Sequence, residues 1–317
     1  MQYLDEEIVK KALNYKILVE RLRQGFGEQK VVTPMRSHYD FEGAPGERDS
    51  TLLLMPSWLP GKNVGVKIVT VSPGNAKHNL PAIHGIYVFF DAQTGDCKYT
   101  FDARAVTVKR TAATSALASS YLSREDSKIL LMIGTGALAP ELIKAHAEVR
   151  PIEKVLVWGR DFEKAKAVCM ALASEKYSSE PVDNLKSACI HADIISCATL
   201  SKTPVLFGEF IKEGQHIDLV GAYRPDMREA DNDVIRQSRI FVDHYAGALK
   251  ECGELLIPIE EKIIQRSDVL AELSELCSGK KSGRKSKREI TLFKSVGHAM
   301  EDLIAAQIIA ELCTEEK

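Results

Sequence analysis

Two glycines stand two residues apart where an apolar run, ILLMIG, ends near the middle of the chain. Gly134 permits a tight turn, and Gly136 lets the backbone approach a pyrophosphate at the positive end of a following helix. Ala139 completes the pattern G-x-G-x-x-A and is small enough for that helix to pack on the strand. We therefore expect this turn to bind a dinucleotide. The contacts expected in it are Gly134, Thr135, Gly136, Ala137, Leu138 and Ala139.

The end of the next expected strand indicates which nicotinamide cofactor fits. NAD sites usually have Asp or Glu there for the ribose 2′-hydroxyl, whereas Arg accommodates a 2′-phosphate. This chain has Arg160 at that point and Asp161 directly after it. The alternative is that Asp161 caps the next helix and Arg160 is only solvated. We expect NADPH, with NADH as the second cofactor.

Other classes of function find no support in the 317 residues. No G-x-S-x-G motif and no metal-ligand spacing occurs, so neither a hydrolase nor a metal site is expected. The 42 Lys+Arg and 44 Asp+Glu give a net charge of −2, which offers no electrostatic reason to bind nucleic acid or a membrane. The basic run at 279–289 is expected to be a solvated loop between a helix and a strand. Seven cysteines without C-x-x-C, no long apolar run and no signal-like start predict a cytoplasmic protein with free thiols.

The second half of the chain must position the glycine turn. It alternates helical periodicity with five short apolar runs, which are ILLMIG, KVLVWG, DIISCA, HIDLVGA and RIFVDH. Strands that are apolar on both faces and separated by helices form a parallel sheet covered on both sides. We therefore predict a doubly wound α/β domain.

Residues 1 to about 122 follow another pattern, which predicts an α+β domain with an antiparallel sheet. It begins with an amphipathic helix from Ile8 to Leu22, and the runs IYVFFD and CKYTFD form a hairpin across residues 92–95. Asp102 is placed to cap a long helix. The last segment, SVGHAMEDLIAAQIIAEL, has the apolar period of a helix that packs against one of the two domains.

Several segments together resemble the ornithine cyclodeaminase/mu-crystallin family, in the family's order and over nearly the whole chain. They are GVKIV, DAQTG, KRTAATSALAS, IGTGALA, VRPIEKVLVWGR, VGAYRPDMREAD and FKSVGHAMEDLIAA. The resemblance implies a Rossmann-type NAD(P)-binding domain at 123–296. It also implies a substrate-binding and dimerisation domain at 1–122, completed by a C-terminal helix at 297–317, and a homodimer.

The resemblance places three basic residues around the substrate's carboxylate and reacting nitrogen. Arg110 is expected to hold the carboxylate bidentately, with Arg36 assisting. Lys67 lies within an apolar strand, where an unpaired ammonium would be costly, and is the expected catalytic residue. A surface ion pair is the alternative for each, and His84 is a further substrate contact. Further cofactor contacts are expected at Arg160, Ala198, Thr199, Val220, Ser295 and Gly297.

The chain departs from the cyclodeaminases where they carry a catalytic Asp in a G-G-D-C-P-type segment. Tyr223 stands at that position here, in GAYRP. Without the carboxylate, deamination and ring closure of ornithine lack their general base. The A-x-R-P-D form of this segment resembles the ketimine reductase (Δ1-pyrroline-2-carboxylate reductase) branch of the family, and Lys109 before Arg110 points to the same branch. Ala82 replaces a Thr of the cyclodeaminase and alanine dehydrogenase type. His298 is a second histidine that the resemblance places near the active cleft.

We therefore expect NAD(P)H-dependent reduction of cyclic imino acids. The expected reactions are Δ1-pyrroline-2-carboxylate to L-proline and Δ1-piperideine-2-carboxylate to L-pipecolate. The alternatives within enzymes are ornithine cyclodeaminase and alanine dehydrogenase. The alternative of another class is a mu-crystallin-like protein that binds NADPH and a ligand without turnover, although such a protein would not need three cations around a carboxylate.

Overall fold

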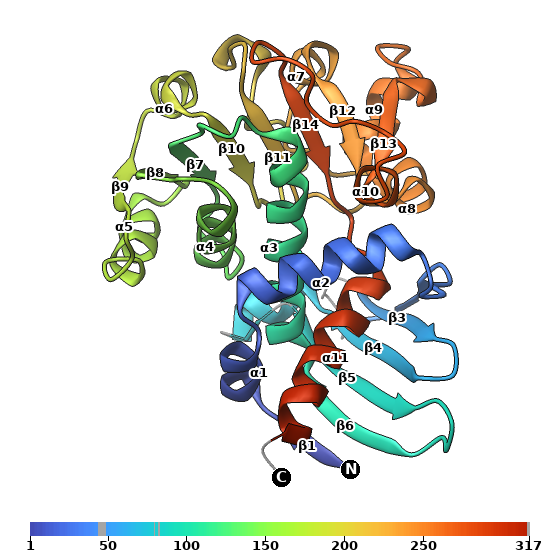
Figure 1. The fold of residues 1–317 in the computed structure, drawn as a ribbon. Helices are drawn as coiled ribbons and strands as arrows, with labels where there is room; N and C mark the ends of the chain where they lie inside the picture. Colours follow the sequence, from blue (N-terminus) through green and yellow to red (C-terminus); the bar gives the residue numbers. More distant parts are fainter. Residues whose placement is uncertain (44–48, 79, 82, 316–317) are drawn as a thin grey trace. The chain divides into compact units, whose positions relative to one another are not determined.

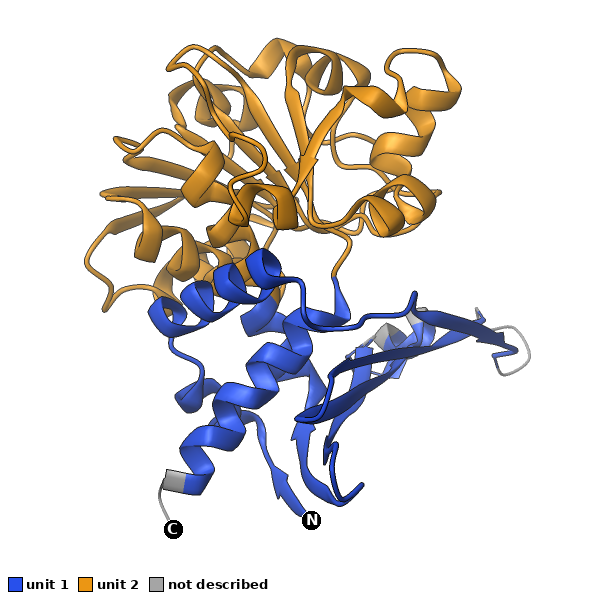
Figure 2. Cartoon of the chain, turned by 45° about the vertical axis from the view of Figure 1, so that its right-hand side comes forward, with its two compact units in different colours: residues 1–110, 298–317 blue, residues 111–297 orange. Residues whose placement is uncertain are grey.

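A computed structural model describes residues 1–43, 49–78, 80–81 and 83–315, and the chain divides into two compact units (Figure 2). Residues 1–110 and 298–317 form the first unit, and residues 111–297 form the second. The division falls inside helix α3 (Ala103–Leu122). The sequence placed it after residue 122, at the end of that helix.

Six strands form the sheet of the first unit, in the order β1-β6-β5-β4-β3-β2. The hairpin of β5 and β6 across residues 92–95 is confirmed. The pairs from β2 to β6 are antiparallel, whereas β1, which the sequence did not predict, adds a parallel edge beside β6. The strands are β1 (Gln2–Leu4), β2 (Ser37–Phe41), β3 (Ser50–Leu59), β4 (Asn63–Val71), β5 (Ile83–Asp91) and β6 (Cys97–Asp102).

The helices of the first unit differ from expectation at the start of the chain. The single helix from Ile8 to Leu22 is wrong, because the Asn14 side chain accepts from the N–H groups of Lys16 and Ile17 and starts a new helix. The last helix packs against α2, β3 and β4 (Figure 1), and Asp102 caps α3 by accepting from the N–H of Ala105 at 2.7 Å. The helices are α1 (Glu6–Ala12), α2 (Tyr15–Glu28), a 3₁₀ turn (Pro73–His78) and α11 (Ala299–Glu315).

Eight parallel strands form the sheet of the second unit, in the order β13-β12-β14-β11-β10-β7-β8-β9 (Figure 1). The five predicted strands are confirmed as β7, β8, β10, β11 and β12. The sequence missed β9 and β13, whereas the strand expected after the basic run is confirmed as β14, which lies between β11 and β12. The strands are β7 (Ile129–Ile133), β8 (Lys154–Trp158), β9 (Ser178–Val182), β10 (Ile194–Cys197), β11 (His216–Leu219), β12 (Arg239–Val242), β13 (Val269–Glu272) and β14 (Thr291–Lys294).

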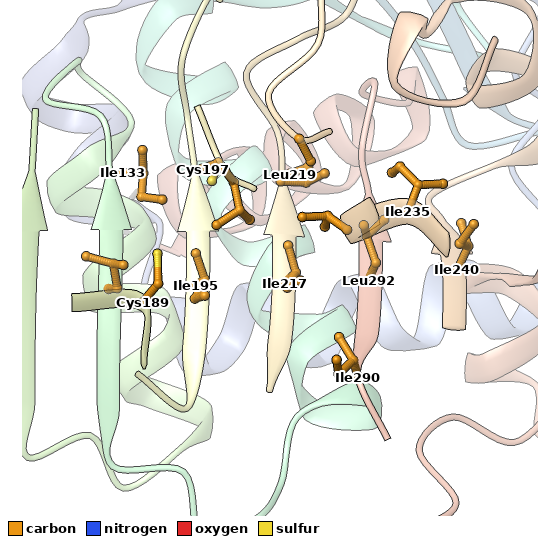
Figure 3. Close-up of a cluster of buried hydrophobic side chains, with 14 of the residues drawn as sticks. Ile133, Cys189, Ile195, Cys197, Ile217, Leu219, Ile235, Ile240, Ile290 and Leu292 are labelled. Atoms are coloured by element: carbon orange, nitrogen blue, oxygen red, sulfur yellow. The ribbon is translucent and has the colours of Figure 1, made fainter. Parts of the chain in front are cut away.

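Helices between these strands cover the sheet and complete a doubly wound fold. Apolar side chains of the central strands, Ile195 and Ile217 among them, form one buried cluster with Cys189 of α6 and Ile235 of α7 (Figure 3). Among the described residues, no helix is long and apolar enough to cross a membrane. The helices are α4 (Ala139–Val149), α5 (Phe162–Ala171), α6 (Leu185–His191), α7 (Asn232–Gln237), α8 (Tyr245–Glu251), α9 (Gly253–Glu260) and α10 (Leu273–Cys277), with 3₁₀ turns at Gly208–Phe210 and Arg266–Asp268.

The basic run at 279–289 is a loop, but one of its cations is not solvated as expected. The guanidinium of Arg284 donates to the carbonyl oxygens of Leu122 (2.6 Å) and Gln215 (2.8 Å) and to the hydroxyl of Thr291 (3.0 Å). This side chain therefore joins the end of α3 to the starts of β11 and β14. The neighbouring Lys285 is exposed, as predicted for the run as a whole.

Candidate functional site

The turn after β7 has the shape that phosphate binding requires. Gly134 has a φ of +123°, and a Cβ there would lie 2.6 Å from the carbonyl oxygen of Ala198, so only glycine fits. A Cβ at Gly136 would meet nothing within 4 Å. The Leu138 side chain makes no capping hydrogen bond at the start of α4, where the N–H of Ala139 donates to the carbonyl oxygen of Gly136 (3.0 Å) and Pro140 has no N–H. These residues fit the pyrophosphate of a dinucleotide.

The sheet brings the other expected cofactor residues to the same edge. The N–H of Ala198 donates to the last residue of β7 (2.9 Å), that of Val220 to the last residue of β10 (3.0 Å), and that of Ser295 to the last residue of β11 (3.1 Å). Each residue thus continues the strand ladder by one step beyond the carboxyl ends of β10, β11 and β14. The carboxyl edge beside the point where strand order reverses is where open α/β sheets bind ligands.

Two buried carboxylates that sequence reasoning missed hold the loops at this edge. Asp243 follows β12 directly and accepts from the N–H groups of Val296 and Gly297 at 2.7 Å and from the Ser295 hydroxyl at 3.0 Å. Burial alone would raise the pKa of Asp243, but His244 and these N–H donors hold it below its usual value. The second carboxylate, Glu229, accepts from the loops after β10 and β11. An acid at the end of an apolar run, as in RIFVD, was the only local signal for Asp243.

Arg160 and Asp161, directly after β8, were expected either to select the cofactor or to serve as a solvated residue and a helix cap. Asp161 does cap α5, because its Oδ1 accepts from the N–H groups of Glu163 (3.0 Å) and Lys164 (3.3 Å). Arg160 is exposed and makes no ion pair with the part of the chain that the structure describes. The carboxylate is thus engaged by the helix, and the guanidinium is accessible to an anion.

Two of the three expected substrate residues meet in a buried ion cluster of the first unit. The Nζ of Lys67, on β4, lies 2.8 Å from Asp302 Oδ2, and its side chain is 3% exposed. Arg110, on α3, binds Asp302 Oδ1 through Nε (3.0 Å) and Glu301 Oε2 through Nη1 (2.6 Å). Both acids lie on α11 and are fully buried. The alternative of a surface ion pair is therefore wrong for Lys67 and Arg110.

The pKa of Lys67 is lowered by its burial and by the neighbouring cation. Burial, and next the charge of Arg110, lower the pKa of Lys67 to about 8, although Asp302 opposes the shift. An ammonium with such a pKa is largely protonated at neutral pH and is a stronger acid than an exposed lysine. The sequence contained no local signal for the acids beyond the pair ED at the start of an otherwise apolar helix.

Strand register separates His84 from Lys67 and does not reach Arg36. Arg36 is half-buried and directly precedes β2, outside the paired residues of that strand. His84 is exposed and pairs with a residue three positions beyond Lys67 on β4. Successive residues of a strand alternate between faces, so His84 lies on the opposite face.

The remaining residues singled out from the sequence lie outside these groups. Tyr223 is half-buried in the loop after β11. The Nζ of Lys109 lies 4.4 Å from the centre of the Tyr15 ring, and the ring of His298 stacks on Phe26. Ala82 lies outside the described residues. Within those residues no group of three His, Cys, Asp or Glu could hold a metal ion.

Comparison with known proteins adds whole-chain similarities. The model of the ornithine cyclodeaminase/mu-crystallin family matches residues 2–317. A protein of Schizosaccharomyces pombe without a characterised function is 46% identical over 97% of this chain and 96% of its own length. The Δ1-pyrroline-2-carboxylate reductase of Colwellia psychrerythraea is 38% identical over 98% of this chain and 99% of its own.

A solved structure shares the whole fold. It is the Δ1-pyrroline-2-carboxylate reductase of Thermococcus litoralis in complex with NADH and L-proline, with a TM-score of 0.94 and 34% identity. The similarity covers 100% of this chain and 98% of that one. The full-length family match, the relatives and the shared fold agree, and the chain belongs to the ornithine cyclodeaminase/mu-crystallin family.

Proposed function

We propose that the protein is a reductase of cyclic imino acids that uses a reduced nicotinamide dinucleotide. Its principal reaction is the conversion of Δ1-pyrroline-2-carboxylate to L-proline, with Δ1-piperideine-2-carboxylate to L-pipecolate as the second. The observation that carries the proposal is the whole-chain likeness to the T. litoralis reductase that binds NADH and L-proline. The phosphate-binding turn and the buried cations supply the two kinds of site that this reaction needs.

The second unit is assigned to the cofactor. The glycine turn at 134–138 and the positive end of the α4 dipole receive the pyrophosphate, and the loops after β10, β11 and β14 surround the rest. Bound there, the nicotinamide supplies a hydride for C2 of the imine. The exposed Arg160 suits a 2′-phosphate, so we propose a preference for NADPH, with NADH also accepted.

The first unit is assigned to the imino acid. Arg110 is the proposed partner of its carboxylate, because Glu301 and Asp302 hold the guanidinium plane in one orientation and planar geometry favours bidentate binding. The substrate carboxylate shares the guanidinium with those two acids. Arg36, directly before β2, is proposed to assist. Lys67 is the proposed proton donor to the ring nitrogen, since its lowered pKa favours release of the proton.

We also propose that the protein is a homodimer, because one face of the first unit's sheet carries apolar side chains that are not fully buried. Side chains of β3, β4 and β5 alternate between the covered face and a second face where apolar residues are only half-buried. The half-buried Leu54 and Ile68 and the exposed Ile86 stand side by side in register on that face. An apolar sheet face of this kind is typical of an interface with another subunit. The seven free cysteines favour a reducing compartment, and we propose the cytoplasm.

The function is tested by oxidation of NADPH and NADH with each cyclic imine, with ornithine and NAD as the control. We expect rapid oxidation with Δ1-pyrroline-2-carboxylate and no proline from ornithine. Tyr223 stands where a carboxylate base would act, and a phenol with a pKa of about 10 is a poor base at neutral pH. Turnover of ornithine, or of pyruvate with ammonia, at rates above imine reduction would replace the proposal with one of the two other enzyme activities.

Arg160→Ala should lower kcat/KM for NADPH and leave kcat/KM for NADH nearly unchanged. The loss of a charge-assisted contact of about 1.5 to 3 kcal/mol corresponds to roughly one to two decades in kcat/KM for NADPH. Lys176→Ala removes the same charge from an exposed position beyond the far end of α5 and serves as the matched control. Equal losses for both cofactors would show that Arg160 does not read the 2′-phosphate.

Lys67→Met should lower kcat by about two to four decades, because a positioned proton donor acts mainly in the transition state. The affinity for cofactor should stay intact. Lys67→Arg should not restore activity, since a guanidinium hardly gives up a proton. In the wild type, kcat should fall as the pH rises through about 8, where Lys67 loses its proton. A Lys67→Met enzyme with normal kcat and raised KM would show that Lys67 only helps to bind the substrate carboxylate and is not the proton donor.

Arg110→Lys is the companion variant, because it keeps the charge beside Glu301 and Asp302 but removes the planar pair of donors. It should act mainly on the KM for imine, since the carboxylate is bound alike in ground and transition states. Thermal unfolding of both variants separates loss of function from loss of fold. A lower kcat with an unchanged KM would contradict the role given to Arg110.

Ile68→Glu should convert the dimer to a monomer, because it places a charge at the centre of the half-buried apolar face. Light scattering after size exclusion measures the mass. Lys11→Glu, a charge reversal on the exposed side of α1, should remain dimeric. A wild-type protein of 35.1 kDa in solution would refute the dimer.

A further inference from the structure

A fully buried carboxylate, Glu229, joins two loops at the carboxyl edge of the second sheet. Its Oε1 accepts from the N–H (2.7 Å) and the hydroxyl (2.9 Å) of Thr199, in the loop after β10. Its Oε2 accepts from the N–H groups of Gly221 (2.8 Å) and Ala222 (3.3 Å), in the loop after β11. Each oxygen therefore serves a different loop.

The loops after β10 and β11 are in close backbone contact where Gly221 meets Thr199. A Cβ at Gly221 would lie 2.0 Å from the carbonyl oxygen of Thr199 and 2.2 Å from its nitrogen, so any other residue would push the loops apart. The residues that precede this contact, Ala198 and Val220, are expected cofactor contacts. Small movements of either loop thus reach the proposed cofactor site directly.

We propose that Glu229 is a positioning residue for the nicotinamide cofactor, which fixes the loops after β10 and β11 relative to each other. The inference rests on the proposed function, because it assigns these loops to the cofactor. The role requires an ionised carboxylate. An amide or a protonated acid presents a donor on one oxygen position, and that position already faces N–H donors.

The surroundings of Glu229 set its ionisation. Lys294 of β14 lies with Nζ 3.8 Å from Glu229 Oε2 and 4.0 Å from Oε2 of Glu254, on α9. Cys197 of β10 is a further titratable group on which the charge of Glu229 acts. Burial raises the pKa of Glu229 against the charge of Lys294, and the charge of Glu254 adds to the rise. As the pH falls below neutrality, the pair of Glu229 and Glu254 takes up a proton, and a proton on Glu229 removes the acceptor of one loop.

The test is NADH affinity, measured by nicotinamide fluorescence from pH 8 to pH 6. Glu229→Gln should raise the Kd about ten- to a hundredfold at pH 8, the loss of a charge-assisted hydrogen bond. Wild-type affinity should weaken toward pH 6, whereas that of Glu229→Gln should stay flat. Asp231→Asn is the matched control, because both N–H groups that Asp231 binds, those of Gly208 and Val234, donate to its Oδ1, which an amide retains. It should keep wild-type affinity and wild-type pH dependence.

Glu229→Asp provides a second test should Glu229→Gln fail to fold. It keeps the charge beside Lys294, but its side chain is one methylene shorter and cannot reach both loops, so NADH affinity should fall several-fold at pH 8. Unchanged affinity in Glu229→Gln, or a wild-type pH dependence in that variant, would overturn the inference alone. A wild-type protein that binds neither NADPH nor NADH would overturn the proposed function together with it.

Discussion

The fold of the first unit depends on a buried ion cluster, in which Lys67 and Arg110 pair with Glu301 and Asp302. Lys67 and Arg110 could not remain charged inside the fold without Glu301 and Asp302, because removing one side of a buried pair typically costs about 3 to 5 kcal/mol. The acids lie near the C-terminus, on α11, whereas the cations come from β4 and α3. The end of the chain must therefore return to the sheet formed by its beginning, and residues 298–317 belong to the first unit.

The same ion cluster suits the proposed chemistry. The acids orient the guanidinium of Arg110 for an incoming carboxylate, and burial makes Lys67 a better proton donor than an exposed lysine. The second unit uses buried carboxylates in another way. Asp243 and Glu229 accept from the backbone of three loops, and so fix the edge where the cofactor is proposed to bind. In each unit, buried acids hold the functional groups in place.

Local patterns predicted the parts of the fold that depend on neighbouring residues. The turn at Gly134, five parallel strands, the hairpin at 92–95 and the cap at Asp102 all arise within short windows of sequence. Asn14 was missed as a helix start because the apolar period continues through it. The strands β9 and β13 were missed because each is short and contains polar residues, SSEPV in β9 and VLAE in β13, so neither forms an apolar run.

The ion cluster depends on contacts between distant segments, which no local pattern encodes. Lys67 and Asp302 are 235 positions apart, so the burial of Lys67 predicted a partner but could not name it. The position of His84 could not be predicted for a similar reason. Its face of the sheet follows from the register between β4 and β5, and that register places it away from Lys67.

Transfer of deuterium tests the central claim most directly. NADPH labelled at C4 on one face or the other of the nicotinamide is incubated with Δ1-pyrroline-2-carboxylate, and the proline is analysed by mass spectrometry and NMR. The account predicts that one of the two labelled cofactors delivers its deuterium to C2 of L-proline, because the hydride passes directly from a cofactor held in one orientation. Proline without label from either cofactor, or no proline at all, would contradict it.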